Sequence, residues 1–178
     1  MGQRTSKVVV GALALTALLS ACSSSPGAAA IVGDRTITQS ELERAQTELA
    51  PLLSDSSPSS VLSVLLVAPL YVDAAAENGV GVSTEEARTL LETSATSAGM
   101  DPVPAFGEGA IEIARFSLAA QALQGLDNGA DLVAEIQEQV AALDVTVNPR
   151  YGEMDPATGV ISATTLPWIV PDAEAAAG

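Results

Sequence analysis

The sequence contains no histidine and only one cysteine among its 178 residues. Without histidine, the chain cannot form a Ser-His-Asp or Cys-His catalytic site, a histidine metal site or a histidine pH switch. A single cysteine cannot form an internal disulfide or a thiolate zinc cluster. We therefore expect no bound metal ion and no organic cofactor.

Basic and aromatic residues are also scarce. Seven Lys and Arg residues stand against 22 Asp and Glu residues, which gives a formal net charge of −15. Because nucleic-acid binding needs a basic patch, we expect no nucleic-acid partner. Aromatic residues make up 3 % of the chain, so a protein-binding surface would have few strong anchors and should bind weakly.

The amino terminus has the pattern of an export signal. Arg4 and Lys7 precede an apolar run over residues 8–19, which at 12 residues is shorter than the roughly 20 residues of a membrane span. The run ends in Leu-Ser-Ala-Cys, with the cysteine at position 22. This segment resembles the lipobox of bacterial lipoproteins. An ordinary secretory signal, with Cys22 at this position by chance, is the alternative.

The lipobox resemblance implies a membrane anchor at Cys22. Residues 1–21 would be removed as a signal peptide. The Cys22 thiol would carry diacylglycerol, and the new amino group is often acylated, for example by palmitate. We expect a location on the extracytoplasmic face of the cell membrane. The processed chain would keep five arginines, no lysine and all 22 acidic residues, a net charge of −17. Residues 22–29, rich in small and polar residues, are predicted to be a flexible tether.

The remaining chain is predicted to be mainly α-helical. Its hydrophobic content of 48 % is too high for a disordered protein, and its length allows one domain. Apolar spacing predicts about five helices, with a small sheet formed by an amino-terminal hairpin over residues 29–37 and a strand over residues 144–147. The helices are expected at residues 38–53, 57–77, 83–98, 108–126 and 130–143. The domain would span residues 30–152, followed by an irregular tail over residues 153–178.

Local signals fix several helix ends. Thr-x-x-Glu at residues 38–41 and Ser-x-x-Glu at residues 83–86 are capping boxes, and Ser57-Pro58 is a typical helix start. The helix that follows Pro58 is apolar almost all round, which is typical of a helix enclosed by others. Pro69 should free a carbonyl near Leu65. A second membrane span is disfavoured because the apolar run in this helix is only about ten residues long.

Three segments, in order, resemble one chaperone family. Residues 32–42 read Val-Gly-Asp-Arg-Thr-Ile-Thr-Gln-Ser-Glu-Leu, residues 77–83 read Glu-Asn-Gly-Val-Gly-Val-Ser, and residues 145–152 read Val-Thr-Val-Asn-Pro-Arg-Tyr-Gly. These segments resemble the SurA amino-terminal-like domain of SurA/PrsA-type extracytoplasmic chaperones. The resemblance implies a helical domain that binds unfolded or apolar peptide segments. It also implies that the hairpin and the late strand share a small sheet. A parvulin proline-isomerase module would need about 90 more residues, so we expect that activity to be absent.

Residues that could suggest other chemistry have simpler interpretations. The segment at residues 127–138 superficially resembles a calcium loop, but it has glycine at its third position and Leu132 where the turn needs glycine. The paired acids Glu41/Glu43 and Glu85/Glu86 lie at expected helix starts, where the helix dipole favours negative charge. We therefore expect that the chain is not an enzyme.

Apolar residues of the second helix, with two phenylalanines, are the candidates for a peptide-binding groove; packing in the core is the competing interpretation. These candidates are Leu62, Leu65, Leu66, Val67, Tyr71, Phe106 and Phe116. The first functional hypothesis is a tethered chaperone whose partners are unfolded or partly folded exported proteins. The alternative is a cell-envelope assembly or adaptor lipoprotein with one dedicated partner. The oligomeric state is left open.

Overall fold

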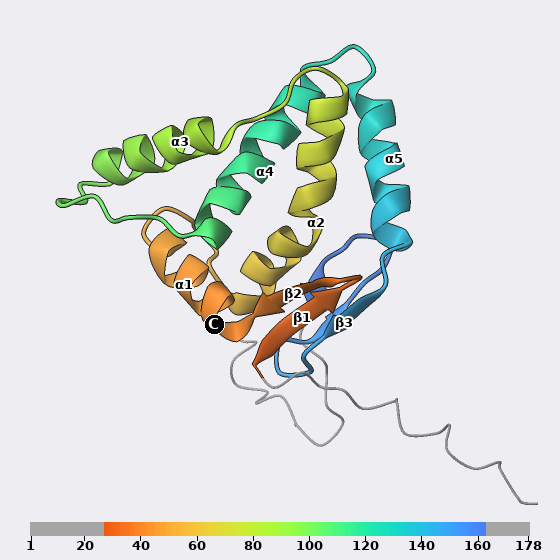
Figure 1. Ribbon diagram of the computed structural model, residues 1–178, viewed down its shortest axis with the longest axis horizontal. Helices are drawn as coiled ribbons and strands as arrows, with labels where there is room; N and C mark the ends of the chain where they lie inside the picture. Colours follow the sequence, from red (N-terminus) through yellow and green to blue (C-terminus); the bar gives the residue numbers. More distant parts are fainter. Residues whose placement is uncertain (1–26, 163–178) are drawn as a thin grey trace, which may run out of the picture.

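The computed structural model describes residues 27–162, which form five helices and a small antiparallel sheet (Figure 1). This confirms the predicted mainly α-helical class. Cys22, the signal segment before it and residues 163–178 lie outside the described residues. The predicted lipid attachment and the last part of the predicted tail therefore have no structural description.

The sheet consists of the predicted amino-terminal hairpin and the predicted late strand. Strand β1 (Ala28–Val32) pairs antiparallel with β2 (Arg35–Thr38) on one edge and with β3 (Val145–Val147) on the other. Gly33, with a φ of +53°, permits the tight turn between β1 and β2. The late strand thus returns to the hairpin across more than a hundred residues of sequence.

The predicted flexible tether, residues 22–29, overlaps the folded domain by two residues. Residues 28 and 29 belong to β1, and their alanine side chains are 8 % and 0 % exposed. Small residues next to serine, proline and glycine have the composition of a linker, but here the small side chains let the strand lie close against the helices. Composition alone cannot separate these two uses of alanine.

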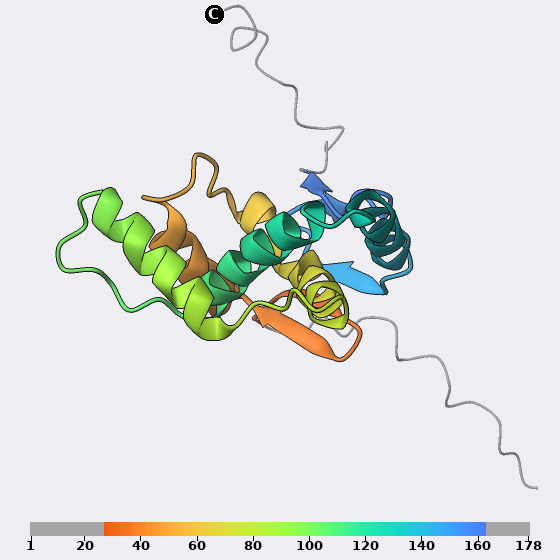
Figure 2. The ribbon, with the colours of Figure 1, turned by 90° about the horizontal axis from the view of Figure 1, so that it is seen from above.

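Helices α2 (Pro58–Glu77) and α4 (Glu108–Gln124) pack together at the centre of the domain. Helices α1 (Gln39–Leu49) and α3 (Thr84–Ser97) lie on one side of α4, and α5 (Gly129–Ala141) lies on the other side of the central pair (Figures 1 and 2). The sheet covers one end of the bundle. The main apolar cluster joins α1–α4 to the sheet, and a second joins α2, α4 and α5.

Helix caps follow the predicted residues with one difference. At α3 both halves of the capping box form: Glu86 N donates to Ser83 Oγ at 3.2 Å, and Ser83 N donates to Glu86 Oε2 at 2.8 Å. At α1 only Glu41 N donates to Thr38 Oγ1, at 3.1 Å. The Glu41 carboxylate lies instead 3.9 Å from Arg35. A nearby guanidinium thus competes with the cap for this carboxylate.

Helix α2 is the one helix in the described part of the chain that is long and apolar enough, by length and composition, to cross a membrane. Seven of its residues are buried inside the domain, against α1, α4, α5 and the sheet. Enclosure by several neighbours explains why apolar residues occur all round this helix.

The segment predicted to be an irregular tail contains a second, two-stranded sheet. Strand β4 (Glu153–Met154) pairs antiparallel with β5 (Ile161–Ser162), and Ile161 is 4 % exposed. The backbone N–H of Ile161 donates to Ser63 Oγ of α2 at 2.8 Å. Strands of two residues are too short to show alternation in the sequence, and their order comes from contacts with α2.

Candidate functional site

Four of the seven predicted groove residues are core residues. Leu62 and Leu65 are fully buried, Leu66 is 2 % exposed, and Phe106 is 6 % exposed. All four belong to the main apolar cluster. The prediction that the four residues line one open groove is therefore wrong. Leu62, Leu65 and Leu66 lie on a face of α2 that the sheet and neighbouring helices cover. Phe106 lies just before α4, packs in the same cluster and borders the hollow between α1 and α4.

The other three candidates are half-buried, and they lie elsewhere. The rings of Tyr71 and Phe116 meet edge to face, with centroids 4.8 Å apart. Val67 contacts both apolar clusters and lies against Gly159 of the β4–β5 hairpin. The seven residues thus do not form one surface, and none lines the apolar groove described below.

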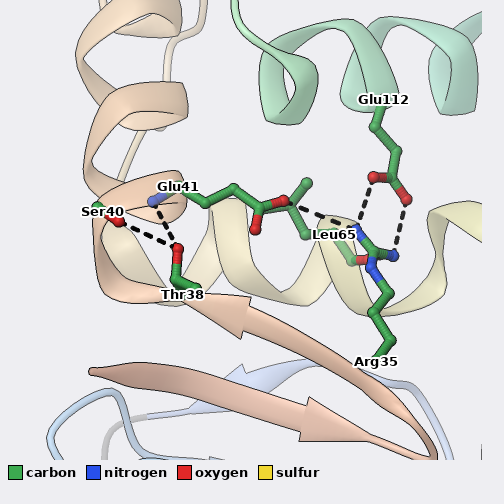
Figure 3. Close-up of polar contacts among 6 residues, drawn as sticks. All are labelled: Arg35, Thr38, Ser40, Glu41, Leu65 and Glu112. Carbon is green, nitrogen blue, oxygen red and sulfur yellow. Dashed lines mark hydrogen bonds and ion pairs between the residues drawn. The ribbon is translucent and has the colours of Figure 1, made fainter. Parts of the chain in front are cut away.

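Arg35 forms hydrogen bonds that join β2 to both α2 and α4 (Figure 3). It lies at the start of β2, directly after the hairpin turn, and points between α2 and α4. Its Nη1 and Nη2 atoms donate to the two carboxylate oxygens of Glu112 at 2.8 and 2.6 Å. Nη1 also donates to the carbonyl of Leu65 at 3.1 Å.

The Leu65 carbonyl is free to accept because Pro69, four residues later, has no N–H to donate to it. This confirms the predicted effect of Pro69. Arg35 replaces the lost helical hydrogen bond and at the same time ties β2 to α2 and α4. We refer to Arg35, Glu112 and the Leu65 carbonyl as the Arg35 clasp.

Burial raises the pKa of Glu112, and the charge and hydrogen bonds of Arg35 offset this only in part. The Glu112 side chain is 22 % exposed and the Arg35 side chain 31 %. A bidentate contact alone would lower the pKa of a carboxyl group, so desolvation is the stronger effect here. Both carboxylate oxygens already accept hydrogen bonds within the clasp, which favours a structural role.

Hollows of similar volume lie on three sides of α4. The first, about 640 Å³, lies between α1 and the start of α4 and is lined by charged residues such as Arg44 and Glu48. The second, about 590 Å³, is lined by three of the five arginines of residues 27–162 together with three acids, so that its charges balance. These six residues are Arg35, Arg88, Arg115, Asp73, Glu108 and Glu112.

The third hollow is an apolar groove of about 600 Å³ between α3 and α4, which we call the α3–α4 groove. Its floor consists of half-buried apolar residues from the α2–α3 linker and from α4. Its rim carries two glutamates of the first turn of α3 and two uncharged polar residues. The floor residues are Val80, Val82, Leu118 and Ala122, and the rim residues are Glu85, Glu86, Thr89 and Gln121.

Arg115 fixes one wall of this groove. Its Nε and Nη2 atoms donate to the carbonyl of Val82 at 3.2 and 3.1 Å. The contact holds the linker between α2 and α3 against α4, while the capping box at Ser83 fixes the start of α3. The hydrogen bonds of Arg115 therefore hold the linker against α4, and the capping box fixes the first turn of α3, which carries the acidic rim.

The described residues contain no cluster of three or more His, Cys, Asp or Glu side chains that could hold a metal ion. Every buried side-chain nitrogen or oxygen among them has a hydrogen-bond partner. No buried polar side-chain atom among them is therefore left for a bound group to satisfy. Of the three hollows described, the α3–α4 groove has the most apolar lining.

Sequence reasoning did not find this groove. Val80 and Val82 lie in a linker, where apolar residues carry no periodic signal. Leu118 and Ala122 share one helical face with the buried Ile111 and Ala114, but they are half-buried at the edge of that face. The one usable signal was the alternation Val-Gly-Val directly before the Ser83 cap, which places two apolar side chains at a helix start.

Comparisons of the chain with protein-family models, with curated proteins and with solved structures find no match.

Proposed function

We propose that the protein is an exported, lipid-anchored binding protein whose helical domain holds apolar segments of unfolded polypeptides outside the membrane. The α3–α4 groove is the observation that carries this proposal. It exposes apolar side chains on a molecule whose surface is otherwise rich in acids. The lipobox-like segment ending at Cys22 supports the anchoring.

The groove suits transient binding. Its floor is aliphatic and contains no aromatic ring, so a bound segment would bury little area and find no strong anchor. The excess of acidic residues keeps a protein with exposed apolar surface soluble. Weak, sequence-tolerant binding is what a holding chaperone needs, because its clients must be released.

A binding role requires no catalytic residues. Of the paired acids, Glu85 and Glu86 lie in the first turn of α3 and Glu41 in the first turn of α1. The Glu112 carboxylate is engaged by Arg35. We therefore propose that the protein acts without enzymatic activity and without a cofactor other than the lipid on Cys22.

An aggregation assay tests the proposal. The chain from residue 23 to residue 178 should slow the aggregation of a reduced or acid-unfolded client at micromolar concentration. The substitution Leu118→Ser, which makes the groove floor polar, should weaken this effect. No effect of the wild-type chain at several-fold molar excess would contradict the proposal. Recovery of one stoichiometric partner from the cell envelope would favour the adaptor function instead.

A further inference from the structure

The rim of the α3–α4 groove carries negative charge on its α3 side only. Glu85 and Glu86 both come from the first turn of α3, whereas the α4 side of the groove contributes Gln121 and no charged residue. The groove therefore combines an apolar floor with an anionic edge. A ligand that matches both must itself combine apolar and cationic groups.

The two glutamates are available to a ligand to different degrees. The Glu85 side chain is 82 % exposed, and its one ion-pair contact within residues 27–162 is with Arg88 Nε at 3.8 Å, too long for a hydrogen bond. Glu86 is held in place because its Oε2 atom accepts from Ser83 N and Ser83 Oγ. These hydrogen bonds lower the pKa of Glu86 and so favour its charged form.

The net charge of each candidate ligand indicates whether it can bind in the α3–α4 groove beside Glu85 and Glu86. A second copy of this chain also carries a strong negative charge and would be repelled. Residues 163–178 contain Asp172 and Glu174 but neither Lys nor Arg, so the chain's own carboxy-terminal segment does not match the rim. Residues 1–21, with Arg4 and Lys7 before an apolar run, match both features, but they would be removed as the signal peptide. A foreign segment with Lys or Arg beside apolar residues therefore remains as the matching ligand.

We propose that the α3–α4 groove binds polypeptide segments in which a lysine or arginine lies next to apolar residues. The apolar side chains rest on Val82, Leu118 and Ala122, and the cation lies beside Glu85 and Glu86. This inference rests on the proposed function and narrows its ligand class.

Binding of three synthetic peptides tests the inference. The peptides share one apolar sequence and differ only in their flanking residues, which are lysine, glutamine or glutamate. Fluorescence anisotropy is measured with the full-length protein in phosphatidylcholine vesicles, with protein-free vesicles as the blank. The lysine peptide should bind most tightly and the glutamate peptide least tightly. The difference should shrink as salt is added, because exposed charges are screened.

Two matched substitutions locate the site. Gln121→Arg places a cation at the rim and should weaken binding of the lysine peptide about two- to five-fold, the range expected for one exposed ion pair. Gln137→Arg changes the net charge equally, but it lies at an exposed position of α5 and should leave the affinity unchanged. Arginine is a strong helix former, so both variants should fold. Glu85→Gln should weaken binding of the lysine peptide but not of the glutamine peptide.

The outcomes separate the two proposals. Equal affinity for the three peptides, or equal effects of Gln121→Arg and Gln137→Arg, would overturn the inference while the proposed function stood. Failure of the wild-type protein to bind any of the three peptides would overturn the proposed function itself.

Discussion

Arg35 shows how a single side chain can connect distant parts of this fold. Its guanidinium joins the hairpin at β2 to a carboxylate of α4 and to a backbone carbonyl of α2. The planar, forked guanidinium can serve a carboxylate and a carbonyl together, which a lysine ammonium cannot do with the same geometry. Most of the pair lies below the surface, so its loss should cost more than loss of an exposed ion pair.

Replacement of Arg35 should therefore destabilise the domain. Arg35→Met leaves the Glu112 carboxylate and the Leu65 carbonyl without partners, and we expect the free energy of unfolding to fall by about 1–3 kcal/mol. Urea denaturation followed by circular dichroism measures the change. Arg88→Met is the control, because the Arg88 and Glu85 side chains are 40 % and 82 % exposed in their ion pair, so its loss should cost about 0.2–0.5 kcal/mol. Equal losses in the two variants would contradict the role of the clasp.

The raised pKa of Glu112 predicts a specific pH dependence. Burial is its main cause, and the facing charges of Arg35, Glu41 and Arg115 contribute with opposite signs. A carboxyl group whose pKa is higher in the folded state binds more protons when folded, so its contribution to stability becomes less favourable as the pH rises above 4.5, its ordinary value. Lowering the pH from neutral toward that value should therefore stabilise the wild type relative to Glu112→Gln.

Denaturant titrations of both proteins across this pH range measure the difference. If the wild type instead lost stability relative to Glu112→Gln on acidification, the ion pair with Arg35 would outweigh desolvation, and the pKa of Glu112 would be lowered.

The predicted location at the cell membrane depends on Cys22. Cys22→Ala removes the thiol to which the lipid would be attached, so the protein should be mis-processed or released from the membrane fraction. Fractionation of cells expressing each form, followed by immunoblotting, measures the distribution. Ser20→Ala, which keeps a small residue two positions before the cysteine, should leave the distribution unchanged. An unchanged membrane fraction for Cys22→Ala would contradict lipid anchoring.

At the scale of elements, the β4–β5 hairpin depends on close contact with the helices. Gly159 has a φ of +71°, and a Cβ atom there would lie 2.9 Å from Val67 Cγ1 and 3.0 Å from Val140 Cγ1. Gly99 has a similar φ of +78°, but a Cβ there would meet nothing within 4 Å. The two glycines share the same backbone requirement and differ in their surroundings.

Alanine at the two positions should therefore have unequal effects. At both positions alanine would have to keep a positive φ, which its Cβ atom disfavours by about 1–2 kcal/mol. Gly159→Ala additionally forces α2 and α5 away from the hairpin and should lower the free energy of unfolding further than Gly99→Ala does. Urea denaturation compares the two. Equal losses would show that the hairpin is not packed against Val67 and Val140.

The elements differ in how well the sequence predicts them. The starts of α2 and α3 follow from Ser57-Pro58 and the Ser83 cap, because these signals act within one helical turn. Helix α1 ends at Leu49, before the predicted end near residue 53, because the chain turns at Pro51. The β4–β5 hairpin could not be predicted, because its two-residue strands depend on partners in α2.

At the scale of the whole molecule, apolar composition did not reveal which surface is open. The groove was predicted on α2 because this helix is long and apolar. Its most apolar face is, however, covered by the sheet and by α1 and α4. The α3–α4 groove arises where a linker, a helix start and the edge of α4 meet. Such a surface depends on the packing angle between helices, which local sequence patterns do not encode.

Charge distribution links this groove to the proposed clients. The chain carries 22 acidic residues against seven basic ones, so basic segments of unfolded chains would be attracted from a distance and acidic ones repelled. The apolar floor would then supply the short-range contact. Attraction of this kind weakens with salt, whereas burial of apolar surface does not.

The central claim is that unfolded polypeptides bind at the α3–α4 groove, and site-specific photo-crosslinking tests it most directly. A photoreactive amino acid replaces Gln121 at the groove rim in one variant and Gln137 on α5 in the other. Both positions are exposed and helical. We predict that an unfolded client rich in lysine and apolar residues crosslinks at position 121 and not at position 137. Equal crosslinking at both positions, or none at position 121, would contradict the claim.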